Sequence, residues 1–543
     1  MSLFWKRLRE EDAHNTNWAA LAVIVVAIVL MNIIVANCRR NSVVRMQVGE
    51  HKWDKLLLVL EQVESNYVDT VNSDSLVERL LPGLLQSLDP HSVYLPPQQL
   101  QSAEEELVGN FSGIGIQFNM PADTAIVISV VNGGPSERVG LLSGDRIVKV
   151  DESVVAGVNF NQDSLVKLLR GERGSKVKVT IARMGVAEPL LFEITRDRIP
   201  VNSIDAAFIY KPGLAYIKLD KFSRTTYMEF LAAVSKLLAE GMQEMVLDLR
   251  DNSGGYLDQA LLLSNEFLER GKLVTYLEGV HRPRQDFRAD GRGSLQDTKL
   301  YVLVNEASAS SSEIFAGAMQ DNDRALIFGR RSFGKGLVQE PIYFTDNSGL
   351  RLTVARYYTP TGRCIQKPYS KDYVYDIFER YQHGEMTSAD SIKRNDSLKF
   401  TTPGGKVVYG GGGIIPDIFV PLDTVGVTKF LISVNRKSLQ VKFSNLIADR
   451  YRERLNSVTT IEELNALYDS IDLAAEFLKY ARANGVTEPQ EEWQISKEII
   501  INQIEGLVGR YTKLDDEAFY TYVLRSDNVM QRVLQCREEQ QSN

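Results

Sequence analysis

The sequence predicts a multidomain α+β protein, and three observations lead to that prediction. An apolar segment lies close to the N-terminus, short strands and turns begin near Phe111, and apolar strands alternate with helices from Ile199 onward. A chain of 543 residues is also too long to fold around one hydrophobic core. We therefore expect several regions with distinct folds.

Composition narrows the class of protein. Hydrophobic residues make up 44% and charged residues 24% of the chain, as in ordinary globular proteins. The formal net charge of −8 comes without a concentrated basic face, so no nucleic-acid partner is expected. The three cysteines are too widely spaced for a disulfide framework or a zinc site, and the five histidines are scattered. We expect no cofactor and no metal.

Residues 17–37 are predicted to form a transmembrane anchor after a short tail over residues 1–16. Asn32 is the only strongly polar residue within residues 18–36, and a helix rising about 1.5 Å per residue over that length nearly matches a hydrocarbon core of roughly 30 Å. A buried helix or a cleaved signal peptide is the alternative, and Cys38 hints at a lipoprotein signal. Positive charges flank both sides, so the positive-inside rule does not decide the orientation.

Residues 41–105 are predicted to form a small N-terminal helical region. Leu56 and Leu60 recur on one helical face, and the segment LDPHSVYLPP over residues 88–97 then breaks the helical pattern. We interpret His91 within that segment as a structural hydrogen-bonding residue rather than a catalytic one.

Residues 106–198 are predicted to form a compact β-rich domain. The segments FSGIGIQF, AIVISVV, RIVKVDES, KVKVTIARM and LLFEITRD each have the pattern of a short strand. Residues 164–171 supply one helix between them.

Residues 199–425 are predicted to form an α/β layer structure. The strand EMVLDLR over residues 244–250 leads through a tight turn into a helix, and the strand KLYVLVNE over residues 299–306 leads through a serine cluster into another. The polar segment at about residues 368–408 is predicted to be a surface insertion. Residues 426–543 are predicted to be a helical C-terminal region.

The serine cluster holds the first candidate for chemistry. It consists of Ser308, Ser310, Ser311 and Ser312. A nucleophile at the start of a helix faces free backbone N–H groups and the positive end of the helix dipole, and both stabilise a developing oxyanion. In the earlier turn, Gly254 or Gly255 allows close backbone approach and could give a second N–H donor. On turn chemistry alone, two ordinary capped helix starts remain the better interpretation.

Lys335 favours a catalytic interpretation of the serine cluster over two ordinary capped helix starts. It stands between two glycines in GRRSFGKGLVQ and is closely followed by apolar residues, which suits an amine placed in a crowded site rather than on a solvated surface. A lysine base must lower its pKa from about 10.4 towards 7, and burial without a carboxylate partner does this. A serine–lysine dyad of this kind needs no histidine.

The stretch LVNEASASSSEIFAGAMQDNDRALIFGRRSFGKGLVQ over residues 303–339 resembles the catalytic core of the carboxyl-terminal processing peptidases, also called tail-specific proteases. The resemblance implies that Ser310 is the nucleophile, Lys335 the base and Gln339 the residue that supports the lysine. Ala307 replaces the family's usual glycine and Ser311 its usual alanine, and neither change removes a catalytic group.

The likeness extends over roughly residues 50–425 and implies the remaining architecture. GPSERVGLLSGDRIVKVD looks like the second half of a PDZ domain, and the core is expected to be a ClpP/crotonase-like α/β protease core. The backbone N–H of Ser311, with that of Gly254 or Gly255, is expected to bind the oxyanion. A PDZ loop that cradles a substrate's terminal carboxylate is expected at Ser112, Gly113, Ile114, Gly115 and Ile116.

The function expected from these observations is that of a membrane-anchored serine endopeptidase with its catalytic region outside the cytoplasm, in the periplasm. Its partners would be proteins or peptides with exposed C-termini and the membrane through residues 17–37, and a homo-oligomer is left open. One alternative is a non-catalytic PDZ scaffold that binds protein C-termini. A weaker alternative is an acyl-CoA enzyme of the crotonase type, which would need a nucleotide-binding surface and no PDZ domain.

Overall fold

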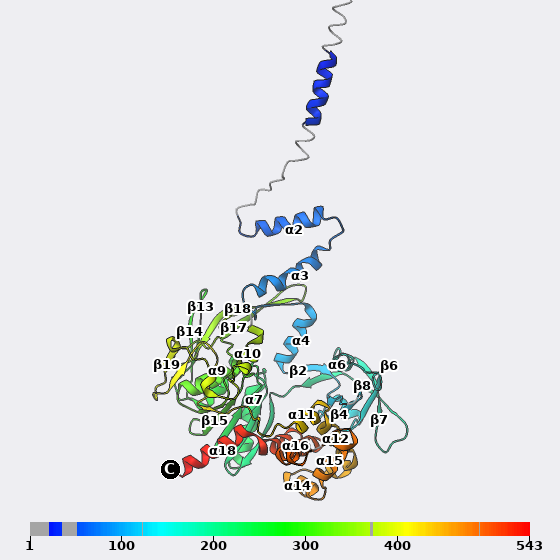
Figure 1. Cartoon of the computed structure of the whole chain (residues 1–543), viewed down its shortest axis with the longest axis vertical. Coiled ribbons are helices and arrows are strands. Elements are labelled where there is room, and N and C mark those ends of the chain that lie inside the picture. Colours follow the sequence, from blue (N-terminus) through cyan, green and yellow to red (C-terminus); the bar gives the residue numbers. More distant parts are fainter. Residues whose placement is uncertain (1–20, 35–50, 122, 370–372, 488, 543) are drawn as a thin grey trace, which may run out of the picture. The chain divides into compact units, whose positions relative to one another are not determined.

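The structure is a computed structural model that describes residues 21–34, 51–121, 123–369, 373–487 and 489–542 (Figure 1). The chain divides into two compact units, Met1–Leu81 and Pro82–Asn543.

The first unit is helical. It contains a helix over residues 21–34, helix α2 (Asp54–Asn66) and most of α3 (Ser73–Gln86), and α2 has no buried residue. Within the described residues, no helix combines the length and the apolar character needed to cross a membrane. Both ends of the predicted anchor, residues 17–20 and 35–37, lie outside the described residues.

A β-rich region follows helix α4 (Pro97–Val108) in the second unit. Its sheet has the strand order β3-β4-β5-β7-β8 with β6 paired to β5, so β3 is an edge strand. A separate ribbon pairs β2 with β9, and the helices α5 and α6 complete the region. The bounds are β2 (Asn110–Gly113), β3 (Ile116–Asn119), β4 (Ala125–Val130), α5 (Pro135–Val139), β5 (Arg146–Val150), β6 (Ser153–Val154), α6 (Gln162–Leu169), β7 (Lys176–Ala182), β8 (Leu190–Thr195) and β9 (Asp197–Pro200).

The central sheet of the second unit has six strands in the order β10-β11-β12-β15-β16-β21. All neighbouring pairs are parallel except β10 with β11. Helices α7, α8 and α9 connect its strands. The bounds are β10 (Ile204–Lys211), β11 (Leu214–Leu219), α7 (Thr226–Ala239), β12 (Glu244–Asp248), α8 (Leu257–Phe267), β15 (Lys299–Val304), α9 (Ser311–Asp321), β16 (Leu326–Gly329) and β21 (Ile418–Phe419).

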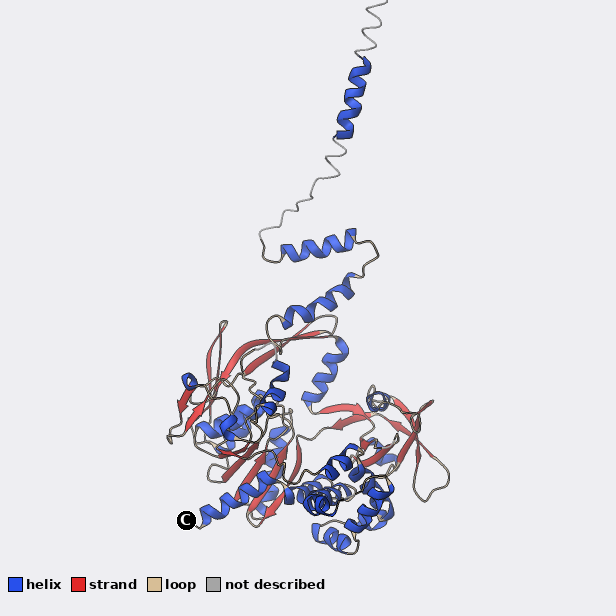
Figure 2. Ribbon diagram, viewed as in Figure 1, coloured by secondary structure: helices blue, strands red, loops and turns tan. Residues whose placement is uncertain are grey.

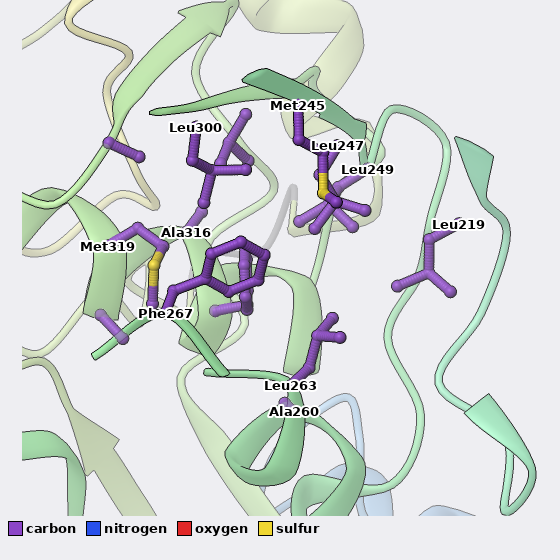
Figure 3. Close-up of a cluster of buried hydrophobic side chains, with 14 of the residues drawn as sticks. Leu219, Met245, Leu247, Leu249, Ala260, Leu263, Phe267, Leu300, Ala316 and Met319 are labelled. Atoms are coloured by element: carbon purple, nitrogen blue, oxygen red, sulfur yellow. The ribbon is translucent and has the colours of Figure 1, made fainter. Parts of the chain in front are cut away.

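Both faces of the central sheet are buried, because its strands alternate between two hydrophobic cores. Met245 and Leu247 of β12 pack with α8 and α9, whose Phe267 and Met319 lie in the same cluster (Figure 3). Val246 between them faces a second cluster on the other side of the sheet. A strand that is buried on both faces has a continuous run of apolar residues, which is typical of parallel sheets.

A second sheet borders the central one and has the order β1-β18-β13-β14, with β17 also paired to β18. Its edge strand β1 comes from the predicted N-terminal helical region, directly after the LDPHS segment. The bounds are β1 (Val93–Leu95), β13 (Leu273–Gly279), β14 (Arg282–Arg288), β17 (Leu337–Tyr343) and β18 (Gly349–Tyr358).

The segment predicted as a surface insertion contains short helices and the hairpin of β19 and β20, and several of its side chains are buried. Tyr373, Arg380 and Glu385 are each less than a tenth exposed. Arg380 donates to the backbone carbonyls of Arg331 and Ser332, so the segment packs behind the loop that carries Lys335. The bounds are η1 (Tyr373–Tyr375), α10 (Asp376–Gln382), η2 (Ala389–Ser391), η3 (Asp396–Leu398), β19 (Lys399–Thr401) and β20 (Val407–Tyr409).

The C-terminal region is helical, as Figure 2 shows, and has a hydrophobic core of its own. Its last helix, α18, leaves that core and covers the second face of the central sheet with Val529, Met530 and Val533. Arg146 of β5 pairs with Asp449 of α12, which ties the region to the β-rich region as well. The bounds are α11 (Lys429–Arg436), α12 (Leu439–Arg450), α13 (Arg452–Ser457), α14 (Ile461–Asp469), α15 (Leu473–Ala483), α16 (Gln490–Gly509), α17 (Asp516–Val523), η4 (Leu524–Ser526) and α18 (Asn528–Gln541).

Candidate active site

Two strand–turn–helix units lie side by side at the carboxyl ends of β12 and β15. We call residues 249–256 the first turn and residues 305–310 the second turn. The strands are parallel neighbours with Asp248 opposite Leu303, so both turns leave the same edge of the sheet. The Ala309 N–H donates to the Asn252 carbonyl at 3.0 Å, which joins the turns directly. In α/β sheets this edge is where ligands bind.

The four clustered serines differ in what their hydroxyl groups contact. Three of them are buried, and each donates a hydrogen bond to a backbone carbonyl of the first turn. The pairs are Ser308 Oγ to Leu249 O at 2.7 Å, Ser311 Oγ to Gly255 O at 2.9 Å and Ser312 Oγ to Asn252 O at 2.9 Å. Ser310 is only partly buried, and its hydroxyl donates no hydrogen bond to any described residue; the capping box of α9 uses it as an acceptor, from the Glu313 N–H. Ser310 is therefore the serine of this cluster whose oxygen is free to react.

Ser310 also has an unusual backbone. It lies directly before α9 with φ 55° and ψ −115°, a conformation that costs a non-glycine residue about 1–3 kcal/mol and is found mostly at functional sites. Gly254, at φ +102°, faces it so closely that a Cβ there would lie 2.7 Å from Ser310 Cβ and 2.9 Å from the Ser311 nitrogen. The glycine is required because no side chain fits between the two turns.

Lys335 and Gln339 are brought together, whereas Lys335 and Ser310 are not yet hydrogen-bonded. The Lys335 ammonium donates to Gln339 Oε1 at 3.1 Å, and within the described part of the chain no hydrogen bond joins Nζ to the Ser310 hydroxyl. The Gln339 side-chain N–H₂ donates to the backbone carbonyl of His91, which orients its oxygen towards the lysine. Burial, and then the positive charge of Arg351, lower the pKa of Lys335.

His91 contacts this group through its backbone and through its ring. Ring Nε2 lies 2.6 Å from the Tyr373 hydroxyl. Burial, followed by the charge of Lys335, lowers the pKa of His91 to about 4, so the ring is neutral near pH 7. This geometry agrees with a structural role for His91, since its ring makes no hydrogen bond to Ser310.

Glu313 is a site residue that sequence reasoning missed. Its carboxylate is fully buried and accepts four hydrogen bonds that join the second turn to the lysine loop. The donors are Ser310 N at 2.9 Å, Ser332 Oγ at 2.5 Å, Gly334 N at 2.7 Å and Lys335 N at 2.9 Å. Burial raises its pKa, and these donors oppose the rise. The Ser-x-x-Glu spacing of a capping box was visible in the sequence and would have marked this residue.

Ser310 and Lys335 line one cavity of about 930 Å³. Its wall is mostly apolar and comes from α4, the first turn and the strands β17 and β18, with Leu100, Leu257 and Val338 among its residues. A cavity of this size accepts an extended peptide segment.

The predicted oxyanion donors are not equivalent. The Gly254 N–H donates to Asn252 Oδ1 at 2.8 Å and is therefore engaged. Among the described residues, no hydrogen-bond acceptor is recorded for the N–H groups of Gly255 and Ser311. These two backbone donors are available at the turn that carries Ser310.

The predicted carboxylate-binding residues run from the end of β2 through Ile114 and Gly115 to the first residue of the edge strand β3. The Ile114 carbonyl accepts hydrogen bonds from the backbone and the hydroxyl of Ser136, and the Gly115 carbonyl accepts one from Val131. The N–H groups of Ile114 and Gly115 have no recorded acceptor in the described part of the chain. Ser112 Oγ is buried there without a hydrogen-bond partner. This loop therefore offers hydrogen-bond donors beside the edge strand β3. It consists of Ser112, Gly113, Ile114, Gly115 and Ile116.

Metal-ligating residues do not gather anywhere in the described residues, since no group of three or more His, Cys, Asp or Glu side chains is placed to hold a metal ion.

Three family sequence models match the chain. The model described as Peptidase family S41 matches residues 213–375, and the PDZ domain model matches residues 112–194. Residues 430–514 match a family of unknown function, DUF8443. The central sheet region and the β-rich region are therefore a peptidase core and a PDZ domain.

Curated relatives match the same regions. The chain is 38% identical over 314 residues to the carboxy-terminal-processing protease of Bartonella bacilliformis, covering 57% of this chain and 71% of that protein. It is 34% identical over 320 residues to the carboxy-terminal processing protease CtpA of Bacillus subtilis, covering 59% and 68%. A peptide-bound PDZ domain structure of the carboxy-terminal protease from Vibrio cholerae is 36% identical over 17% of this chain and 99% of that chain, with a TM-score of 0.16.

Proposed function

Since the chain belongs to the carboxy-terminal processing proteases of peptidase family S41, which are serine peptidases, we propose that Ser310 and Lys335 form its catalytic dyad. The observation that supports this proposal is that the hydroxyl groups of the four clustered serines differ in their hydrogen bonds. Three hydroxyls donate to carbonyls of the first turn, whereas Ser310, whose hydroxyl donates to none of them, lines the cavity that Lys335 also lines.

Peptide hydrolysis follows from the positions of these groups. Ser310 Oγ attacks the carbonyl carbon of the scissile amide while the neutral Lys335 amine takes the hydroxyl proton. The resulting ammonium gives that proton to the leaving amine, and water then hydrolyses the acyl-enzyme. For this to happen the amine must turn from Gln339 Oε1 towards Ser310, so Gln339 holds the lysine between turnovers.

The tetrahedral intermediate needs donors for its oxyanion. We assign this role to the Ser311 N–H together with a glycine N–H of the first turn. Gly255 is the better placed of the two predicted glycines, because the Gly254 N–H must first leave Asn252. Donors fixed in advance in a site that excludes water commonly make the largest single contribution to catalysis.

We further propose that the PDZ domain reads the C-terminal carboxylate of a substrate through the loop from Ser112 to Ile116. The substrate tail would add a strand to the free edge of β3. Amidation of the C-terminus removes the charge that the loop would bind. Equal kcat/KM values for the free-acid and the amidated form of one peptide would rule this role out.

The proposed location rests on the apolar character of residues 18–36. We propose that residues 17–37 anchor the protein in a membrane, with the catalytic region in the periplasm. Alkaline carbonate should leave the full chain in the membrane fraction, and deletion of residues 1–40 should release it. Extraction of the full chain by carbonate would refute the anchor.

The dyad is tested by peptide hydrolysis together with labelling by a fluorophosphonate probe, which reacts with activated serines. Ser310→Ala should lose both hydrolysis and labelling while remaining folded. Lys335→Ala should be almost inactive, because it lacks the amine. Lys335→Arg should be almost inactive as well, because a guanidinium does not deprotonate in proteins. Substantial hydrolysis by Lys335→Arg would exclude the lysine as the base.

A further inference from the structure

The cavity that holds Ser310 and Lys335 contains a further cation that has no recorded partner among the described residues. Besides Lys335, its charged lining residues are Glu104, Lys221, Arg224, Asp258 and Arg351. Four of these five have contacts within the protein: Glu104 with the Tyr343 hydroxyl, Lys221 with Asp220 at 3.5 Å, Arg224 with the Tyr256 hydroxyl at 3.3 Å and Asp258 with Gln259 at 3.3 Å. For Arg351, no hydrogen bond or ion pair to any described residue is recorded.

Arg351 is held in the wall of the cavity. It lies on β18 between Val93 of β1 and Pro341 of β17, so strands fix its backbone on both sides. Its guanidinium acts on the Lys335 amine across the cavity, since its charge is the second cause of the lowered pKa of that lysine. The cation therefore stands close to the proposed dyad and is only partly exposed to solvent.

An unpaired guanidinium in a mostly apolar cavity is costly, because it gives up hydration without gaining an anion. That cost is recovered when a ligand brings the anion. The planar fork of arginine suits a carboxylate, which it binds through two parallel hydrogen bonds. A peptide carries carboxylates in two places: at its C-terminus and on aspartate or glutamate side chains.

We propose that Arg351 binds a carboxylate of the peptide substrate close to the scissile bond and thereby selects substrates. The inference rests on the proposed peptidase function and specifies the substrate that this site takes. It assigns the cavity a preference for an apolar segment that carries one carboxylate at a fixed distance from the cleaved bond.

Binding of such a carboxylate also acts on the lysine. The charged groups that face Lys335 are Arg351, which lowers its pKa, and Glu313 and Asp89, which raise it; His91 is neutral near pH 7. A substrate carboxylate paired with Arg351 offsets the guanidinium's effect, so the pKa of Lys335 rises in the complex. The pH profile of kcat, which reports the complex, should then lie at higher pH than that of kcat/KM for carboxylate substrates, with a smaller difference for neutral ones.

The test uses the full-length protein and one apolar peptide in four forms. The C-terminus is either a free acid or an amide, and a residue near the scissile bond is either glutamate or glutamine, with its position scanned on both sides. The wild-type protein should prefer one carboxylate form by about 10- to 100-fold in kcat/KM, the range of a charge-assisted hydrogen bond. The glutamate and C-terminal arms identify the source of the carboxylate.

Three variants decide the outcome. Arg351→Met keeps an unbranched apolar stem without the charge and should bring the preference ratio close to one. Arg351→Lys should keep part of the preference, and Arg351→Glu should invert it towards the same peptide with lysine at the scanned position. An amidation effect that persists in Arg351→Met belongs to the PDZ domain. Thermal unfolding checks that each variant is folded.

An equal loss of kcat/KM for all four peptides in Arg351→Met would overturn the proposal, as would a wild-type protein without any preference. Failure of the peptidase function itself looks different, because the wild-type protein would then cleave none of the peptides.

Discussion

The first turn and the second turn occupy equivalent positions in the fold but contribute different chemical groups. Both connect a parallel strand to a helix at the same sheet edge. The first turn contributes backbone, with Gly254 and Gly255 at φ +102° and +145°. The second contributes side chains, and Ser310 takes a positive φ without being a glycine.

The difference between the turns shows how the Ser310 hydroxyl differs from those of the neighbouring serines. Carbonyls of the first turn accept hydrogen bonds from three serines of the second turn and the start of α9, and these bonds fix the loop. Ser310 has a strained backbone conformation, and its hydroxyl donates to none of those carbonyls. On the proposed assignment of Ser310 as the nucleophile, chemistry at this edge thus depends on backbone carbonyls of the neighbouring turn.

The largest expected effect comes from exchanging serines within the second turn. Ser310→Ala should lower kcat/KM by about 10⁴-fold or more, in the range known for loss of a serine nucleophile. Ser312→Ala removes one hydrogen bond to Asn252 and should cost about 1 kcal/mol of unfolding free energy. Fluorophosphonate labelling should disappear in the first variant and persist in the second. Labelling that persists in Ser310→Ala would place the nucleophile elsewhere.

The next effect comes from adding one methyl group to the first turn. Gly254→Ala places a Cβ 2.7 Å from Ser310 Cβ and 2.8 Å from the Ala309 carbonyl oxygen. We expect kcat/KM to fall by about 100-fold, because a small displacement of a reactive group has an effect of that order. Gly271→Ala is the matched control, since its φ is also positive, at +84°, but its Cβ would meet no atom within 4 Å.

Gly271→Ala should lose stability, by about 1 kcal/mol as for a strained backbone position, and keep its activity. Peptide hydrolysis and urea unfolding of both variants separate the two effects. If Gly254→Ala were as active as the wild type, the close contact between the first turn and Ser310 would not be needed for activity.

Glu313 links the second turn to the lysine loop, and Glu313→Gln tests that link. A glutamine keeps the shape but turns one acceptor oxygen into a donor that faces N–H groups of the same kind. We expect a fall in kcat/KM of about 10-fold, corresponding to loss of one or two kcal/mol of positioning. Because the Glu313 charge raises the pKa of Lys335, its removal should also move the rising limb of the kcat/KM profile to lower pH. A limb that moves to higher pH would contradict this assignment.

The smallest effect concerns stability. The pKa of Lys335 is lower in the folded protein than in the unfolded chain, so the unfolded chain binds more protons and stability rises with pH through this window. The contribution is least favourable below the folded-state pKa of the lysine and is recovered as pH approaches its ordinary value of about 10.5. Lys335→Met should therefore be inactive yet more stable than wild type near neutral pH, with the difference shrinking at high pH. Urea unfolding at several pH values measures this, and a wild type that is more stable than the variant at pH 7 would count against a buried, desolvated amine.

The sequence by itself determined the features that depend on short range. Alternating apolar residues predicted the strands, and the strand–turn–helix order predicted the α/β layers, because these patterns repeat within a few residues. Resemblance over residues 303–339 implied the roles of Ser310, Lys335 and Gln339, which remain a prediction, and the family matches confirm the family assignment. The Ser-x-x-Glu pattern that ends at Glu313 is a short-range feature of the same kind.

Only the tertiary structure decided which groups meet. The Ser308 hydroxyl bonds a carbonyl 59 residues away, and Gln339 bonds the carbonyl of His91, which is 248 residues away. Arg351 resembles any other strand arginine in the sequence. Only the assembly of β1, β17 and β18 around the cavity shows that no described residue forms a hydrogen bond or ion pair with its side chain. Local patterns specify strands and turns, whereas a hydroxyl or a cation is free or engaged according to contacts that only the folded chain brings together.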